Sequence, residues 1–456
     1  MWSPSSQPDP QQQQNLKAAA TTLVQRLQQA GYETYWAGGC VRDQLLQRTP
    51  YDYDIATAAT PDQVLNVFPH ANAVGRNFGV VIAEQNRCLF EVATFRIDQG
   101  YSDGRHPDAI TFATAEEDAQ RRDFTINAMF WDPISQTLHD FVQGQHDLQA
   151  RIIRCVGNPH LRFQEDHLRM LRAVRFAHRL DFQLDPHTAT AISTEAPRLR
   201  HISPERIRDE LTRILMEAQR PGQAVWTLET LGLLRTFLPE VSDLQHQQQP
   251  PEFHPEGDVL THTLMMLDDM ALRTPALAYA VLLHDIAKPA TATYTGDRIR
   301  FHGHAELGAR MAESILRRLR MSNALIEEVC ACVRGHMRFM EVQKMRTSTL
   351  RRMVGSPYFP TEMELHRLDC RACHGMLDHY AFLEQKIQAF EQEPVLPEPW
   401  VRGNDLIAMG LKPGPHFGKI LKQAYDQQLE GNVKNREALL QWLHQQADRR
   451  PKTEDL

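Results

Sequence analysis

Two aspartates near the start of the chain have the spacing of a metal-binding pair. Asp52 and Asp54 lie two residues apart in the segment 51–57, whose aromatic and β-branched residues predict a strand. Alternate side chains of a strand share a face, so the two carboxylates point to the same side. Adjacent carboxylates repel each other unless a cation lies between them, and hard oxygen ligands suit Mg²⁺, which can activate a hydroxyl and stabilise a leaving pyrophosphate. Glu91, on a further predicted strand, is either a third carboxylate of this site or an exposed strand residue.

A glycine pair precedes the aspartates. Gly38 and Gly39 follow a short predicted strand, 35–37, and stand at the start of a predicted helix. Such glycines let main-chain N–H groups approach a phosphate, and Arg42 adds positive charge at the helix start. Alone, the glycine pair is an ordinary turn and the aspartate pair a solvated strand edge. Their combination at this spacing favours a nucleotide site.

A third polar group follows at residues 121–127. Arg121 and Arg122 can clamp a triphosphate, while Asp123 and Asn127 can hydrogen-bond ribose hydroxyls. The alternative is a helix N-terminus that Asp123 caps. Both interpretations can hold for different residues of the group.

A helix predicted from Glu165 to about Leu180 carries an acceptor and a donor one turn apart. Asp166 and Arg169 lie on the face opposite its apolar stripe. A carboxylate and a planar guanidinium held in one plane can imitate the Watson–Crick partner of a base. The alternative is an exposed ion pair worth a few tenths of a kcal/mol.

The second half of the chain carries histidines and aspartates at helical positions. A lone histidine is more often a satisfied buried side chain than a ligand, but imidazoles and carboxylates on facing helices are how helix bundles build metal sites. Such a site could bind Mn²⁺, Fe²⁺, Ni²⁺ or Mg²⁺ and activate water against a phosphoester. The candidates, in order, are His262, His284, Asp285, His304, His336 and Asp369.

The ordered motifs resemble a known family. The glycine and aspartate pairs, the group at 121–128, the acidic turn Asp140…Gly144…Asp147, the pair Asp166 and Arg169 and the segment 203–207 occur in the order of the class II tRNA nucleotidyltransferase / bacterial poly(A) polymerase family, over about residues 16–215. The resemblance implies addition of C, C and A to tRNA 3′ ends without a nucleic-acid template, with Mg²⁺ and with CTP and ATP as substrates. The sequence departs from the family's pattern at Gly144, where the family often has two glycines. The segment 96–107 resembles the family's flexible loop, which disfavours an enzyme that stops after CC.

The resemblance also implies roles for the individual residues. It implies that Asp52 and Asp54 hold the metal ions of the nucleotidyltransferase site. It assigns nucleotide binding to Gly38, Gly39, Arg42, Arg122, Asp123, Asn127, Asp166, Arg169 and Arg172.

The histidine and aspartate set resembles the HD phosphohydrolase domain, which some members of the family carry with 2′,3′-cyclic phosphodiesterase or phosphatase activity. This resemblance implies primary metal ligands at His262, His284, Asp285 and Asp369. It places His304 and His336 at a second metal or a phosphate, with His302 and His374 as further candidates.

These residues need an α+β chain to position them. We expect a polymerase-β-like nucleotidyltransferase head with a small mixed sheet and helices, followed by an elongated all-α neck, HD-type body and tail. The neck, 151–220, holds thirteen arginines, no lysine and nine acidic residues. This excess of arginine suits the binding of phosphates and bases. The alternative is a helical region held together by internal salt bridges. The expected parts are a disordered lead-in at 1–15, the head at 16–150, the neck, which selects the base and binds RNA, the body at 221–395 and a helical tail at 396–456, with a low-complexity linker at 245–251.

Composition excludes several classes of protein. The 456 residues carry a net charge of −7, and 42% of them are hydrophobic, which excludes a mostly disordered chain, a collagen and a membrane bundle. The N-terminus lacks the features of a signal peptide, so we expect reduced cysteines and a cytoplasmic location. The expected partners are tRNA, CTP and ATP, with no membrane and no obligate protein partner evident.

Three other functions fit the motifs. An enzyme that adds only A shares all of them. A poly(A) polymerase shares the head motifs, but such enzymes tend to end in long basic tails, whereas this chain ends in QWLHQQADRRPKTEDL. A metal phosphohydrolase with a vestigial transferase head is disfavoured by the intact pair Asp52 and Asp54.

Overall fold

The computed structural model describes residues 10–75, 78–101, 109–250, 257–296, 298–373, 375–390 and 394–448. The chain forms two compact units. The first runs to Asp243 and includes 318–321, and the second comprises Leu244–Arg317 and Ser322–Leu456. The boundary therefore lies beside the expected linker at 245–251, and not at residue 220. Three short helices assigned to the body by sequence belong to the first unit: α10 (Pro221–Thr230), α11 (Leu233–Phe237) and α12 (Pro239–Ser242).

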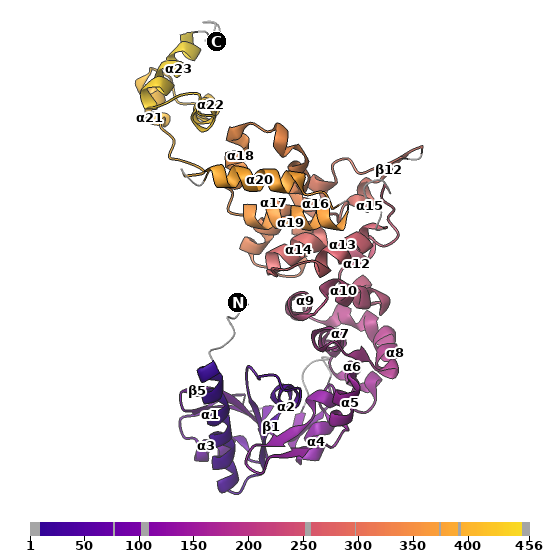
Figure 1. The fold of residues 1–456 in the computed structure, drawn as a ribbon. Coiled ribbons are helices and arrows are strands. Elements are labelled where there is room, and N and C mark those ends of the chain that lie inside the picture. Colours follow the sequence, from indigo (N-terminus) through magenta and orange to yellow (C-terminus); the bar gives the residue numbers. More distant parts are fainter. Residues whose placement is uncertain are drawn as a thin grey trace. The chain divides into compact units, whose positions relative to one another are not determined.

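A seven-stranded mixed sheet forms the head of the first unit (Figure 1). Its strand order is β3-β4-β5-β2-β1-β8-β9, and only the β2–β5 pair is parallel among the strand pairs described for it. Aromatic and β-branched residues dominate these strands, as their propensities require. The strands are β1 (Thr34–Ala37), β2 (Asp54–Thr57), β3 (Asn72–Gly75), β4 (Val80–Gln85), β5 (Cys88–Thr94), β8 (Phe130–Asp132) and β9 (Thr137–His139).

The register of the central strands brings distant sequence together. Antiparallel β1 and β2 pair Ala37 with Asp54, so the turn that follows β1 lies against the start of β2. Parallel β2 and β5 pair Ile55 with Val92, so Glu91 lies beside Asp54. The expected strand at 51–57 is shorter than predicted, and Asp52 precedes it.

Helices cover the sheet. Helix α1 (Pro10–Gln29) buries Leu23, Val24 and Leu27 and packs on β1, β2, β4 and β5. It begins at Pro10, so residues 10–14 are helical where the sequence favoured a disordered lead-in. Helix α4 (Ala115–Gln120) buries Ala115 and Ala119 in a core with Tyr35, Phe95 and Phe130. The remaining helices of the head are α2 (Gly39–Leu45) and α3 (Pro61–Val67).

The expected flexible loop is bordered by a two-stranded hairpin, β6 (Arg96–Gln99) with β7 (Ala109–Phe112). Residues 102–107 of that loop lie outside the described residues.

A single glycine suffices at the turn that leads to the neck. Gly144 is the first residue of α5 (Gly144–Ala150) and is buried. A Cβ at this position would lie 2.3 Å from the main-chain oxygen of Thr125 and 2.7 Å from the Met129 Cγ. No side chain fits there, so the close approach of this turn to residues 125–129 requires glycine.

The neck is helical, but the helix expected from Glu165 to Leu180 is broken. Helix α6 (Pro159–Glu165) ends before Asp166, and α7 (Arg169–Leu180) begins after it. The Asp166 Oδ1 accepts a hydrogen bond from the main-chain nitrogen of Leu168 at 3.0 Å, and this local turn competes with the helix. The neck also holds α8 (Pro186–Glu195) and α9 (Pro204–Glu217), and α7 packs against α9.

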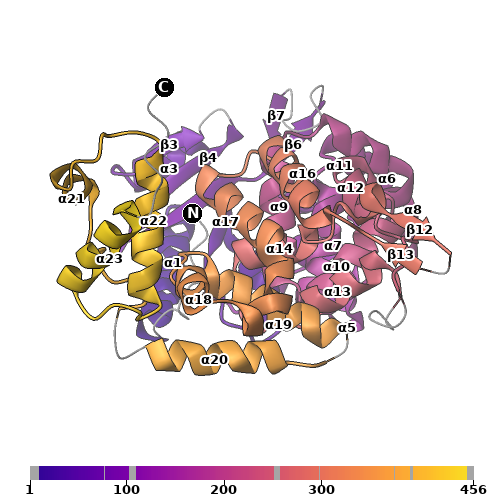
Figure 2. The same cartoon turned by 90° about the horizontal axis from the view of Figure 1, so that it is seen from above.

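The second unit is almost entirely helical. Helix α14 (Pro275–Leu283) is buried throughout and contacts α13 (Val259–Asp268), α17 (Asn323–Gly335) and α19 (Phe359–Ala372) (Figures 1 and 2). Among the described residues, no helix is both long and apolar enough to cross a bilayer. The other elements are α15 (Lys288–Thr291), β12 (Thr293–Thr295), β13 (Arg298–Arg300), α16 (His304–Arg318), η4 (His336–Lys344), α18 (Thr347–Val354), α20 (Asp378–Phe390), α21 (Gly403–Ala408), α22 (His416–Leu429) and α23 (Arg436–Asp448).

Candidate active site

A cavity of about 920 Å³ in the first unit gathers every head and neck residue that the sequence singled out as a site. Its wall is built from β1, β2 and β5 of the sheet, from the turn after α4, and from α7 and α9 of the neck. The gathered residues are Gly38, Gly39, Arg42, Asp52, Asp54, Arg122, Asp123, Asn127, Asp166, Arg169 and Arg172.

Three carboxylates converge in the cavity. Asp52 and Asp54 are joined there by Glu91, the candidate that the sequence left open. Desolvation, together with the negative charges of Asp52 and Glu91, raises the pKa of Asp54 to about 6 against the opposing effect of Arg122. Oxygen donors that repel each other in this way fit a hard divalent cation.

Gly38 brings the main chain close to these carboxylates. Its φ of 73° lies in the left-handed region, and a Cβ there would lie 3.4 Å from the Arg122 Nη1 and 3.8 Å from the Asp54 Oδ2. Arg42 lies in the last turn of α2, and not at its start as expected. It is buried, and its Nη1 donates to the Asn127 Oδ1 at 2.6 Å.

The group at 121–127 follows the end of a helix. The alternative interpretation, in which Asp123 caps the start of a helix, is therefore wrong. Helix α4 ends at Gln120, and the short 3-10 turn η2 (Thr125–Asn127) has no side-chain cap. Asp123 instead accepts hydrogen bonds from Arg172, from Nη2 at 2.6 Å and from Nε at 2.9 Å. Burial alone would raise the pKa of Asp123, but Arg172 holds it below its ordinary value.

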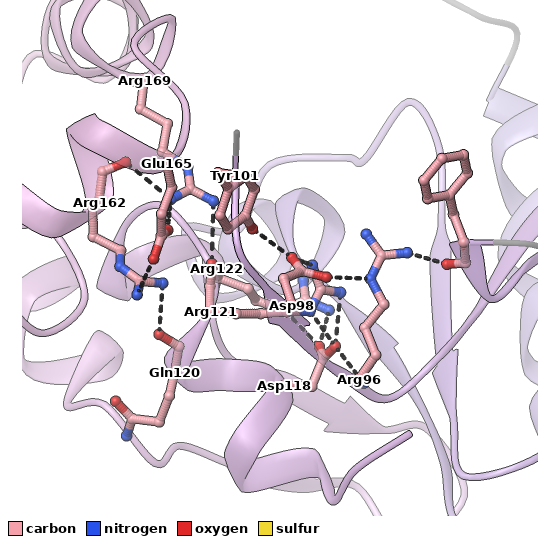
Figure 3. Close-up of polar contacts among 11 residues, drawn as sticks. Arg96, Asp98, Tyr101, Asp118, Gln120, Arg121, Arg122, Arg162, Glu165 and Arg169 are labelled. Carbon is pink, nitrogen blue, oxygen red and sulfur yellow. Dashed lines mark hydrogen bonds and ion pairs between the residues drawn. The ribbon is translucent and has the colours of Figure 1, made fainter. Parts of the chain in front are cut away.

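Asp118 holds two arginines of the cavity, a supporting role that the sequence analysis missed. It is 1% exposed and accepts from the Arg121 Nη2 at 2.7 Å and from the Arg122 Nη2 at 2.9 Å (Figure 3). Burial alone would raise the pKa of Asp118, but Arg122 and Arg121 lower it. The spacings of three and four residues along α4 were the available signal.

Asp166 and Arg169, the pair proposed to read a base, each contact other residues and not each other. Arg169 donates to the Glu165 Oε2 at 2.5 Å and to the main-chain oxygen of Arg121 at 3.2 Å (Figure 3). Asp166 instead accepts from the Arg206 Nη2 at 2.8 Å. The described side chains thus form no Asp166–Arg169 ion pair, and both groups line the cavity.

Several neck arginines fit both interpretations given to them, because they line the cavity and also form internal ion pairs. Arg172, Arg179 and Arg213 line the cavity with the partly exposed Arg206. Arg175 is buried in an ion pair with Glu210 at 2.5 Å, which joins α7 to α9. Arg175 also lines the cavity, and the other four arginines also form ion pairs with acidic residues, so internal salt bridges and cavity lining involve the same arginines.

A second cluster lies within the second unit. His262 on α13 and Asp369 on α19 approach to 3.1 Å, and the Nε2 atoms of His304 and His336 lie 3.1 Å apart. Asp285 lies between them, 3.5 Å from the His304 Nε2. Potential ligand atoms lie within 4.8 Å of one another in three groups: His262 with His284 and Asp285, Asp285 with His304 and His336, and His262 with Asp369 and Cys373.

The cluster concentrates buried charge. Burial alone would raise the pKa of Asp285, yet His284 and Lys288 hold it well below the ordinary value. Burial lowers the pKa of His336 to about 4, so its imidazole is neutral and able to bind a metal. From the sequence alone we expect Cys373 to be a buried thiol and not a ligand, but its sulfur lies with His262 and Asp369 in the third group, at the C-terminal end of α19. His302 is exposed and belongs to none of the three groups, and His374 lies outside the described residues.

Comparison with known proteins follows the same division of the chain. Residues 34–154 match the poly A polymerase head domain, 181–244 the RNA and SrmB binding site of polymerase A, and 303–443 the tRNA nucleotidyltransferase domain 2. A CCA-adding enzyme of Limosilactobacillus reuteri is 33% identical over 426 residues, which cover 92% of this chain and 94% of the relative. A poly(A) polymerase I of Salmonella typhi is 41% identical over 234 residues, 48% of this chain and 49% of the relative.

A solved structure supports the same assignment. The CCA-adding enzyme of Bacillus stearothermophilus in complex with CTP superposes with a TM-score of 0.72 at 28% identity, covering 94% of this chain and 97% of the other. The mixed sheet with carboxylates beside an arginine-lined cavity is the head of a nucleotidyltransferase, which confirms the expected α+β fold. The chain belongs to the family of CCA-adding enzymes.

The anchoring of Arg121 and Arg122 leads to a first prediction. Asp118→Asn removes the charge that orients both guanidinium groups, so we expect the KM for nucleotide to rise about tenfold, the scale of one hydrogen bond to a charged group. Steady-state incorporation kinetics measure it. Glu116→Gln, on the exposed face of the same helix, is the control and should leave KM unchanged. Equal KM values for the two variants would contradict the anchoring role.

Proposed function

We propose that this protein adds C, C and A in turn to tRNA 3′ ends from CTP and ATP, with release of pyrophosphate. One observation carries the proposal: a single cavity joins three carboxylates, a set of anchored arginines and the pair Asp166 and Arg169. The relatives that support it match over more than nine tenths of both chains.

The carboxylates supply the metal-binding part of the reaction. Asp52, Asp54 and Glu91 are the residues that would hold Mg²⁺ in the head. A divalent ion there would favour ionisation of the attacking 3′-hydroxyl and neutralise charge on the leaving pyrophosphate. The bond formed joins the terminal 3′-oxygen of the RNA to the α-phosphorus of the nucleotide, and the bond broken is the one between that phosphorus and the oxygen that bridges it to the β-phosphate.

The arginines orient the substrate. Arg122, fixed by Asp118, and Arg42, fixed by Asn127, stand beside Gly38 and Gly39, where a triphosphate can be bound by side chains and main chain together. Holding the α-phosphate in line with the hydroxyl is itself a large part of catalysis in phosphoryl transfer.

The base-reading pair explains how one cavity serves two nucleotides. Cytosine and adenine both present an amino group next to an unprotonated ring nitrogen. Asp166 can accept from that amino group and Arg169 can donate to that ring nitrogen. Uracil and guanine present a carbonyl next to a ring N–H, which reverses both polarities.

We propose that this activity is cytoplasmic, because the cysteines carry free thiols and not disulfides. All seven cysteines are free thiols, including Cys155 and Cys332 in the cores of the two units. Such thiols are typical of proteins in reducing compartments.

The product length tests the proposal. Purified protein with Mg²⁺ is given tRNAs that end at the discriminator base, at C and at CC, with CTP and ATP separately and together. We expect completion of CCA followed by arrest, and no product from Asp54→Asn, because this change removes a carboxylate of the metal site. A single A added only to the CC end would indicate an A-adding enzyme, and long A tracts a poly(A) polymerase. Either result would contradict CCA addition.

We further propose a metal-dependent phosphohydrolase site in the second unit. It rests on the three groups of ligand atoms around His284 and Asp285. Neutral imidazoles with a carboxylate suit Mn²⁺, Fe²⁺ or Ni²⁺ as well as Mg²⁺. A cation bound there would activate water against a phosphoester.

Metal content tests this second site. The double variant H284A/D285A should lose Mn²⁺ or Ni²⁺ bound after gel filtration, measured by elemental analysis, and should lose hydrolysis of a 2′,3′-cyclic nucleotide while CCA addition persists. His302→Ala, an exposed histidine outside the cluster, is the control and should retain the metal. Undiminished metal content in the double variant would contradict the site.

A further inference from the structure

The carboxylate proposed to read the base is held on both of its oxygens. Asp166 accepts from the main-chain nitrogen of Leu168 on Oδ1 at 3.0 Å and from the Arg206 Nη2 on Oδ2 at 2.8 Å. The first contact belongs to the turn between α6 and α7, and the second comes from another helix, forty residues further along the chain. Together they fix the rotation of the carboxylate about its Cβ–Cγ bond.

Arg206 is itself held in place. It lies in the first turn of α9 and shares a face of that helix with Glu210, four residues later. Glu210 forms the buried 2.5 Å ion pair with Arg175 of α7, which sets the position of α9 against α7. The guanidinium of Arg206 therefore approaches Asp166 from a rigid support.

A second observation separates Arg206 from a purely structural arginine. Its Nη1 is buried and has no hydrogen-bond acceptor in the part of the chain that the structure describes, although the residue lines the cavity. A buried donor on a charged group without an acceptor is unfavourable. An acceptor supplied by a bound ligand in the cavity would satisfy it.

We propose that Arg206 is a positioning residue for base selection, which presents the Asp166 carboxylate as a fixed acceptor to the amino group shared by cytosine and adenine. The inference rests on the proposed CCA addition. With Arg206 in place, each Asp166 oxygen keeps a lone pair for a ligand but cannot turn away from it. Without Arg206, the carboxylate can rotate, and the distinction between amino-bearing and carbonyl-bearing bases weakens.

The test compares three variants in single-turnover incorporation of CTP against UTP and of ATP against GTP. For Arg206→Met we expect the preference for CTP over UTP and for ATP over GTP, measured as maximal incorporation rate divided by nucleotide Kd, to fall at least about tenfold. The loss should come mainly through the Kd for CTP and ATP, on the scale of one hydrogen bond to a charged group. Arg206→Lys should restore part of the preference, because an ammonium can still donate to Asp166. Arg208→Met is the control. Arg208 lies on the same helix, donates to Asp209 and to the main chain of Arg320, and lies outside the cavity lining.

The outcomes separate the inference from the function on which it rests. If the unaltered protein adds no CCA, the proposed function fails. If it adds CCA and Arg206→Met lowers the maximal incorporation rate equally for all four nucleotides with unchanged preferences, Arg206 has only a structural role and the inference is overturned. Thermal unfolding of each variant identifies loss of folded protein, which would change the amplitude of incorporation and not the ratio between nucleotides.

Discussion

The concentration of arginines around one cavity is the constraint on which the rest of this site depends. Guanidinium groups at close range repel each other, and each must be held by an acid that leaves some of its donors facing a substrate. Asp118 does this for Arg121 and Arg122, and Asp123 does it for Arg172. Such buried pairs cost desolvation free energy, so their value lies in fixing positions more than in stability.

Strand register brings negative charge to the same cavity. Pairing of β1 with β2 and of β2 with β5 brings the turn at Gly38 and the side chain of Glu91 to Asp54. Burial first, and then repulsion from Asp52 and Glu91, raise the pKa of Asp54, as is common for carboxylates at functional sites. The mixed sheet and the helical neck thus both supply charged groups to one cavity.

The sequence predicted the parts of the site that are local in the chain. Asp52 with Asp54 and Gly38 with Gly39 could be found because short spacing on one element decides which side chains lie together. Glu91 stayed open because its role depends on a strand pairing that no local pattern specifies. The continuous helix through Asp166 was wrong because a side-chain contact to Leu168 outweighed helical periodicity. The contact from Arg206 to Asp166 joins residues that are forty positions apart, so no local spacing in the sequence could indicate it.

The histidine cluster shows the same limit in the second unit. Its order along the chain predicted most of the members, since His284 and Asp285 are adjacent and the others stand on amphipathic helices. The sequence placed His304 in the site and kept His302 only as a further candidate, and in the structure His304 joins the cluster while His302 is exposed. Only the folded structure shows that the Nε2 atoms of His304 and His336 meet and that Cys373 lies beside His262 and Asp369.

One cavity for both nucleotides is the central claim, and equilibrium competition tests it most directly. Labelled CTP is titrated onto the protein with Mg²⁺ and without tRNA, at increasing fixed concentrations of ATP. The account predicts one CTP bound per chain, with ATP raising the apparent Kd for CTP in proportion to its concentration and leaving the stoichiometry at saturation unchanged. Simultaneous binding of CTP and ATP to one chain would contradict it.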